Sequence, residues 1–226
     1  MWMTQMTTTQ AAERLGISQR QVQRLIEARE LPATRTAGDA WVVDAIAVNA
    51  MARTRPARGR PWSSTTAWAA LWRLSGLEVD WLDRRTLRRL DDRLASIDAE
   101  ELVHATRRRA LVRRYRASES FLADLDALVI RSGARAMERS TFGMDQAVGR
   151  VDGYCTAEAA DSLARDFRLI EDSQGNVTLR VVLAMPPTII EGRDVMPVAV
   201  VAADLAESLE VRERSAGLRI LGDLLR

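Results

Sequence analysis

The chain has 226 residues, 47% of them apolar, which is enough for one large domain or two to three small ones with real cores. Its one cysteine, Cys155, excludes an internal disulfide framework, and no apolar run is long enough for a membrane span. All 33 basic residues are Arg, and the formal net charge is +2. Because no charged and apolar leader opens the chain, we expect a cytoplasmic protein that does not enter a membrane.

The charge is distributed unevenly along the chain. Residues 1–62 contain nine Arg against five acidic residues, and residues 84–116 contain eleven against five. Residues 117–226 reverse the balance, with twelve Arg against eighteen acidic residues. This asymmetry indicates a polyanionic partner for the first part of the chain only.

The N-terminal elements are predicted from capping and turn signals. Residues 1–6 read as a loose end, and Thr7–Thr9 can cap a first helix over Gln10–Leu15. Gly16 is typical of a helix end, and Ser18 with Gln21 forms a capping box that opens a second helix. Leu31–Pro32 closes this second helix.

A small hairpin is predicted next. The stretch Ala33–Val43 reads as two short strands around Ala37, Gly38 and Asp39, and Asp44 can cap a third short helix that runs through Met51. The following segment "ARTRPARGRPWSS" has two Pro, four Arg and no acid, which is typical of a linker.

The remaining elements follow from hydrophobic periodicity. We expect helices over Thr65–Leu74, Val79–Ile97, Asp98–Ala117 and Phe121–Val129, then a strand and a helix from Thr156 or Ala157, a hairpin within Phe167–Leu183, and two closing helices over Met196–Leu209 and Val211–Arg226. The fold class is α+β and mainly helical. Its predicted divisions are a winged helix-turn-helix (1–52), a linker (53–64), a helical region (65–130) and an α/β domain (131–226).

The second helix has the residue types of a DNA-reading helix. A helix-turn-helix places the N-terminal half of its second helix in the major groove, where Arg can bind guanine and Gln can bind adenine. The candidate base contacts are Gln19, Arg20, Gln23 and Arg24. The candidate phosphate contacts are Ser18, Arg35, Arg53, Arg55, Arg58 and Arg60. The alternative is an ordinary amphipathic surface helix.

The segment "TTTQAAERLGISQRQVQRLIEARELPATRTAGDAWVVDAIAV" resembles the excisionase and MerR-like winged helix-turn-helix families. The matching positions include Ala11, Ala12, Leu15, Gly16, Ser18, Val22, Leu25, Ile26, Leu31, Pro32, Ala33, Arg35 and Trp41. The chain departs from the pattern at Arg29, where these families usually have Gly at the helix end. This resemblance implies double-stranded DNA as the partner.

The rest of the chain resembles the AbiEi-type antitoxins of type IV toxin–antitoxin systems. The segments that carry this resemblance are Arg60–Gly76, Glu100–Ala117, Gly175–Val182 and Val200–Leu225. It implies a repressor of its own promoter that acts as the antitoxin to a nucleotidyltransferase-type toxin. On repeated DNA the repressor could bind as a homodimer. The alternative is a free-standing transcription factor or an excisionase-like recombination accessory protein.

Three further patterns each have two interpretations. The Arg residues of 84–93 and 107–116 could contact phosphates or form a solvated face. The four Trp residues at 62, 68, 72 and 81 are more typical of a core than of a base-stacking platform. The stripe of Val211, Leu218, Leu221 and Leu225 is more typical of core packing than of a partner surface.

Residues for catalysis are sparse. With one His and one Cys, no metal cluster of the zinc type can form, and a chain without Lys has no P-loop. Cys155 is expected to be a small buried residue, and Tyr115 beside Arg113 and Arg114 is expected to be packed rather than nucleophilic. We therefore expect no catalytic residue, no metal and no cofactor.

Overall fold

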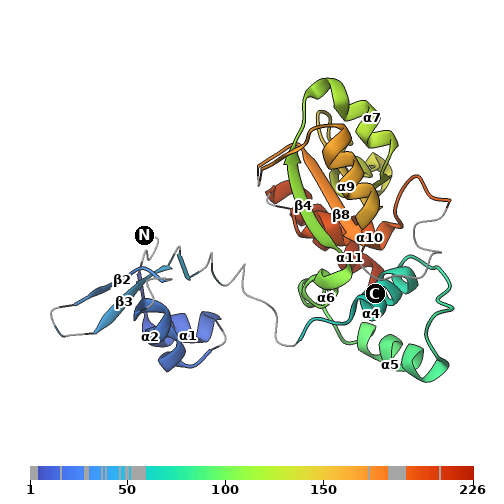
Figure 1. The fold of residues 1–226 in the computed structure, drawn as a ribbon. Coiled ribbons are helices and arrows are strands. Elements are labelled where there is room, and N and C mark those ends of the chain that lie inside the picture. Colours follow the sequence, from blue (N-terminus) through green and yellow to red (C-terminus); the bar gives the residue numbers. More distant parts are fainter. Residues whose placement is uncertain are drawn as a thin grey trace. The chain divides into compact units, whose positions relative to one another are not determined.

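The computed structural model describes residues 5–15, 17–27, 31–36, 38, 40–45, 47–48, 51, 60–172, 174–182, 192–208 and 210–226. Contacts divide the chain into two compact units, Met1–Pro56 and Ala57–Arg226 (Figure 1). The predicted α+β class is confirmed, because each unit combines helices with a sheet. None of the described helices is both long enough and apolar enough to cross a bilayer.

The first unit contains two helices and a three-stranded sheet. Its elements are β1 (Gln5–Thr7), α1 (Thr8–Leu15), α2 (Gln19–Glu27), β2 (Ala33–Arg35) and β3 (Trp41–Asp44). The predicted hairpin is confirmed, because β2 pairs with β3 in antiparallel register, with Thr34 opposite Val42. The expectation of a loose N-terminal end is wrong from residue 5 onward. Strand β1 instead pairs in antiparallel register with the edge of β3 that β2 leaves open.

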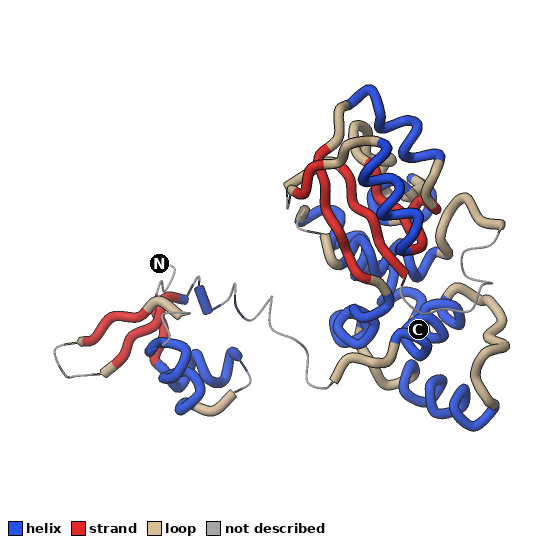
Figure 2. Tube along the Cα trace, viewed as in Figure 1, coloured by secondary structure: helices blue, strands red, loops and turns tan. Residues whose placement is uncertain are grey.

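The second unit has a five-stranded mixed sheet between two helical layers (Figure 2). Its elements are α4 (Ser64–Leu74), α5 (Arg84–Leu94), α6 (Ala99–Thr106), η1 (Arg107–Arg109), β4 (Leu111–Arg116), η2 (Glu119–Phe121), α7 (Leu122–Ala127), β5 (Ile130–Arg131), η3 (Gly133–Arg135), α8 (Arg139–Phe142), β6 (Val151–Thr156), α9 (Ala157–Asp166), β7 (Ile170–Glu171), β8 (Val177–Val182), α10 (Val198–Ala206) and α11 (Val211–Leu224). The strand order is β5-β6-β8-β4-β7; β6 and β8 pair in parallel, and α9 and β7 lie between them in the chain.

Each face of this sheet has its own core. On one face, α7 and α9 pack over residues such as Val177, Leu179 and Val181. On the other face, α4, α10 and α11 form a larger core that includes Trp68, Tyr154 and Leu221. Segments 65–130 and 131–226 both contribute residues to this core. Edge-to-face ring pairs link the Trp side chains at 68, 72 and 81, in agreement with a core role.

Two expectations for the second unit are wrong. The predicted helix over Asp98–Ala117 ends at Thr106, and residues 111–116 instead form the strand β4, which lies between β8 and β7. The predicted hairpin of 167–183 does not form, because β7 and β8 both pair with β4 rather than with each other. Gly175 makes this insertion possible, since any Cβ there would collide with the backbone of Tyr115.

Candidate nucleic-acid interface

The two helices of the first unit are both held by reciprocal capping boxes. The Thr7 N–H donates to Gln10 Oε1 at 3.0 Å, and the Gln10 N–H donates to Thr7 Oγ1 at 3.2 Å. The Ser18 N–H donates to Gln21 Oε1 at 3.0 Å, and the Gln21 N–H donates to Ser18 Oγ at 3.3 Å. Each box satisfies N–H groups that the first helical turn leaves free. The predicted box of Ser18 and Gln21 is thus confirmed, and α1 begins two residues earlier than expected.

The apolar face of α2 is anchored in the core of the first unit. Val22 is fully buried and Ile26 is 7% exposed, and both pack with the buried face of α1 and with Val43 of β3. Because successive helical residues are rotated by about 100°, this anchoring turns the opposite face outward. The face that remains exposed contains all four candidate base contacts, Gln19, Arg20, Gln23 and Arg24.

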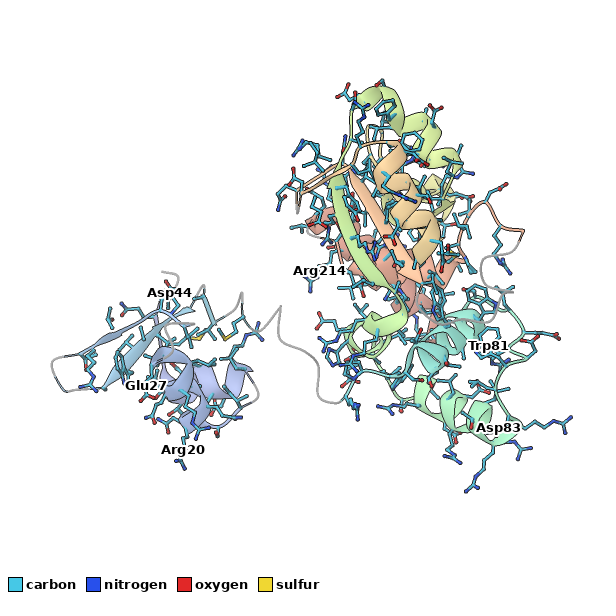
Figure 3. The ribbon with its side chains drawn as sticks, in the orientation of Figure 1. Arg20, Glu27, Asp44, Trp81, Asp83 and Arg214 are labelled. Atoms are coloured by element: carbon cyan, nitrogen blue, oxygen red, sulfur yellow. The ribbon has the colours of Figure 1, made fainter. Side chains whose placement is uncertain are left out.

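These four side chains span an arc of about 140° at the N-terminal end of α2, since they occupy positions i, i+1, i+4 and i+5. Figure 3 shows Arg20 pointing away from the body of the unit. The amide of Gln19 is already engaged, because its Nε2 donates to Thr8 Oγ1 at 2.8 Å. Gln19 would therefore read a base only by giving up or sharing this contact.

The candidate phosphate contacts lie in different places. Ser18 is exposed at the start of α2, where N–H groups favour an anion. Arg35 is exposed on β2, with its guanidinium 4.9 Å from the ring centre of Trp41, which orients it along the hairpin. Arg60 is exposed in the second unit. Arg53, Arg55 and Arg58 lie outside the described residues.

The second unit contains a polar cleft of about 170 Å³ that the sequence did not reveal. Its floor is the sheet face on which Arg114 and Asp152 lie in register with Thr178. Five residues from the end of α10 to the first turn of α11 line it as well: Leu205, Glu207, Ser208, Glu210 and Glu213.

Beside the cleft, Asp204 is the centre of a buried charge network. This carboxylate is fully buried and accepts hydrogen bonds from Arg109 Nη2, from the Tyr154 hydroxyl at 2.9 Å and from Ser132 Oγ. Arg180 Nη1 lies 3.0 Å from the same carboxylate. A charged group without partners would be very costly at this depth, and this one has four.

The two Arg residues of the network are satisfied by two further acids. Arg180 binds Asp152 through Nε at 2.8 Å and Nη2 at 3.2 Å. Arg109 binds both carboxylate oxygens of Glu207 at 2.9 Å. This bidentate geometry is the strong form of an Arg–carboxylate pair.

Burial and charge shift the pKa values of this network. Burial raises the pKa of Asp152, and the nearby Arg180 offsets only part of that effect. Burial also raises the pKa of Tyr154 well above its usual 10.0, which keeps its hydroxyl protonated as a donor to Asp204. Burial acts against the charge of Arg109, but Glu207, Tyr154 and Asp204 outweigh it, so the pKa of Arg109 is raised.

The sequence did contain a signal for this network. Asp204 is a lone charge within "VAVVAADLA", and Arg180 is a lone charge within "VTLRVV". A charged residue inside an otherwise apolar element is buried only when it is paired, so each one predicts a partner from elsewhere in the chain. Within the described residues, no group of three or more His, Cys, Asp or Glu could hold a metal ion.

Comparison with known proteins supports the interpretation of the first unit. Residues 6–56 match the family model described as a helix-turn-helix domain. Neither the search of curated proteins nor the search of solved structures returned a match. The chain therefore has an N-terminal helix-turn-helix domain, a type of domain that binds DNA and serves regulation rather than catalysis.

Proposed function

We propose that this protein is a sequence-specific transcriptional repressor that reads double-stranded DNA with the N-terminal half of α2. The observation that carries the proposal is the exposed arc of Gln19, Arg20, Gln23 and Arg24 on a helix that Val22 and Ile26 anchor in the core, inside a matched helix-turn-helix domain.

The side chains of this arc have complementary roles. Arg20 and Arg24 bind guanine O6 and N7, and Gln23 binds adenine N6 and N7. Ser18 at the start of α2 and Arg35 on the hairpin hold the neighbouring phosphates and fix the position of the helix. Gln19 keeps α2 aligned on α1 through Thr8, and it reads a base only when that hydrogen bond is shared.

A single helix-turn-helix unit buries little surface, so we propose that two copies bind a repeated operator. The resemblance to AbiEi-type antitoxins supports a finer role, in which the operator lies in the protein's own promoter and the protein is the antitoxin to a neighbouring nucleotidyltransferase-type toxin. That resemblance lies mainly in the second unit, which the helix-turn-helix match does not include.

The DNA-binding part is tested by titrating the full chain against a duplex of its own upstream region and against a scrambled duplex. Arg20→Ala and Gln23→Ala should each weaken operator binding by about 5- to 150-fold, the equivalent of about 1–3 kcal/mol for one good base contact. Binding to the scrambled duplex should change much less.

Arg212→Ala is the matched control, because Arg212 is an exposed Arg on α11 in the second unit. It removes the same charge and should leave operator binding unchanged. Equal affinity of the wild-type chain for both duplexes, or equal losses in Arg20→Ala and Arg212→Ala, would exclude α2 as the reading helix.

The antitoxin part needs a separate experiment. Co-expression with a nucleotidyltransferase encoded beside the gene should restore growth that the toxin alone inhibits. If operator binding is specific but growth is not restored, the protein is a free-standing transcription factor or a recombination accessory protein.

A further inference from the structure

The geometry of the second unit points to another DNA-contacting surface, on helix α5. We define the α5 basic face as Arg84, Arg85, Arg88 and Arg89, all four exposed. We infer that this face binds the phosphates of duplex DNA next to the operator that α2 reads. The inference rests on the proposed function, and it assigns a role to an element outside the helix-turn-helix domain.

The α5 basic face has the same spacing as the candidate base contacts of α2. Its members occupy positions i, i+1, i+4 and i+5, so they span an arc of about 140° on one side of the helix. Leu90 and Leu94, which are 4% and 7% exposed, lie on the opposite side and hold the helix on the core. Asp92 is the one acid within the arc, so the face keeps a clear positive excess.

The helix is fixed firmly enough to present this face. Asp83 caps it, with Oδ1 accepting from the N–H groups of Arg85 at 2.9 Å and Thr86 at 3.0 Å. Arg73 binds both oxygens of Asp91 at 3.1 Å, and Arg93 lies 5.1 Å from the ring centre of Trp62. Figure 3 shows Asp83 at the start of α5, where long side chains extend outward from the helix.

Local electrostatics oppose this arrangement. The N-terminal end of a helix is positive, yet α5 has no acid in its first turn and two Arg there. Arg84 with Arg88 and Arg85 with Arg89 are like-charge pairs at i, i+4, which destabilise a helix. Charges that reduce the stability of their own helix indicate a function, and a bound polyanion would relieve the repulsion.

The α5 basic face is also not neutralised within the protein. In the part of the chain that the structure describes, no hydrogen bond or ion pair joins any of its guanidinium groups to another side chain. Elsewhere, Arg113 pairs with Asp161 at 2.6 Å and Arg116 with Asp172 at 2.7 Å. Arg89 helps to lower the pKa of Asp83, but the hydrogen bonds from Thr86 lower it more.

Duplex DNA is the polyanion that fits this chain best. A chain bound through its helix-turn-helix domain keeps its second unit near the flanking phosphates, where even weak contacts add to the affinity. The arc of α2 combines amides with guanidinium groups, whereas the α5 basic face has guanidinium groups alone. We therefore expect α5 to add affinity and salt dependence without adding sequence preference.

The test compares the full chain with the variant Arg84→Gln/Arg85→Gln/Arg88→Gln/Arg89→Gln. The charge-matched control is Arg165→Gln/Arg168→Gln/Arg212→Gln/Arg226→Gln, which removes four exposed Arg elsewhere in the second unit. Affinity is measured at several salt concentrations for a short duplex with the operator alone and for a duplex extended on both sides.

The wild-type chain should bind the extended duplex more tightly than the short one. The α5 variant should lose this preference, and its slope of log affinity against log salt should fall by up to about 3.6 on the extended duplex, from about 0.9 for each phosphate contact. The control should keep both the preference and the slope. Removing repulsion should also leave the melting temperature of the α5 variant equal or higher.

An unchanged slope and preference in the α5 variant, a loss shared equally with the control, or a clearly lower melting temperature would each overturn the inference. If the α5 variant binds duplex RNA more weakly than the wild-type chain does but binds duplex DNA equally well, the choice of DNA is overturned. If the wild-type chain does not distinguish operator from scrambled DNA, yet only the α5 variant binds both more weakly, the proposed reading by α2 fails and the α5 surface stands.

Discussion

Replacing Arg109 by Met should strongly destabilise the second unit. Arg109 is 2% exposed, and its guanidinium donates to the Tyr154 hydroxyl at 3.0 Å, the Thr106 carbonyl at 3.2 Å, Glu207 and Asp204. Met has a similar length and apolar character, so the change removes the charge and the donors while it leaves little empty space.

The size of the effect follows from the charge balance of the network. Arg109 and Arg180 face three acids, Asp152, Asp204 and Glu207, so Arg109→Met leaves three acids with one Arg. Removing one partner of a buried ion pair costs about 3–5 kcal/mol. Because Glu207 is 25% exposed and remains partly hydrated, we expect the lower half of this range, about 3–4 kcal/mol.

Asp204→Asn is the matched comparison, since it changes the same pair from the other side. It leaves two acids with two Arg, and the Asn carbonyl can accept the three contacts that now reach Asp204 Oδ1. Ser132 can reverse its hydroxyl to accept from the new NH₂ group. We therefore expect Asp204→Asn to cost clearly less than Arg109→Met.

Urea unfolding followed by Trp fluorescence measures this difference, because four of the six Trp residues, at 62, 68, 72 and 81, lie in the second unit. Thermal melting should show a drop of about 6–16 °C for Arg109→Met, from about 2–4 °C for each kcal/mol in a domain of this size. If Asp204→Asn destabilises as much as Arg109→Met, the argument from charge balance is refuted.

Two further predictions concern the thiol of Cys155 and two glycines of α11, Gly217 and Gly222. Burial raises the pKa of Cys155 to about 11, so at pH 8 its thiolate fraction is roughly 100-fold below that of the unfolded chain, and a thiol reagent should label the native protein at least about 100-fold more slowly. Rapid labelling of the native protein would contradict the burial of Cys155. Because the pKa of Cys155 is raised in the folded state, its contribution to the free energy of unfolding is complete below about pH 9 and declines as the pH rises toward 11. Gly217→Ala should destabilise by about 1–3 kcal/mol, because a Cβ would lie 2.5 Å from Ala206 N and closer still to the Ala202 carbonyl oxygen. Gly222→Ala on the same helix, with nothing within 4 Å, should instead stabilise by up to about 1 kcal/mol, so equal behaviour of the two variants in urea unfolding would refute the close approach of α10 and α11.

The first unit was largely predictable because its signals are local. The capping box of Ser18 and Gln21 lies within four residues, and the apolar spacing of Val22 and Ile26 defines the buried face of α2. Strand β1 was missed because Gln5–Thr7 has no strand pattern of its own. Its conformation depends on pairing with β3, more than thirty residues later in the chain.

The second unit was less predictable because distant segments determine its conformation. "ALVRRYRA" has the composition of a helix, and its exposure in the structure does not alternate cleanly along the strand. Residues 111–116 become β4 because β8 and β7 pair with both of its edges and Tyr115 is buried in the sheet core. The network of Arg109, Arg180 and Asp204 joins three segments that only the fold brings together.

The two Arg-rich segments show that composition alone does not define a phosphate-binding surface. In 107–116, Arg109 is buried against acids, and Arg113 and Arg116 are paired across the sheet surface. At these three positions a phosphate would have to compete with carboxylates already in place. The α5 basic face contains one acid, Asp92, but none of its four Arg forms an ion pair among the described residues, and its helix buries Leu90 and Leu94 while it turns these Arg outward. A search for phosphate contacts should therefore begin with α5, although residues 107–116 have the longer run of consecutive Arg.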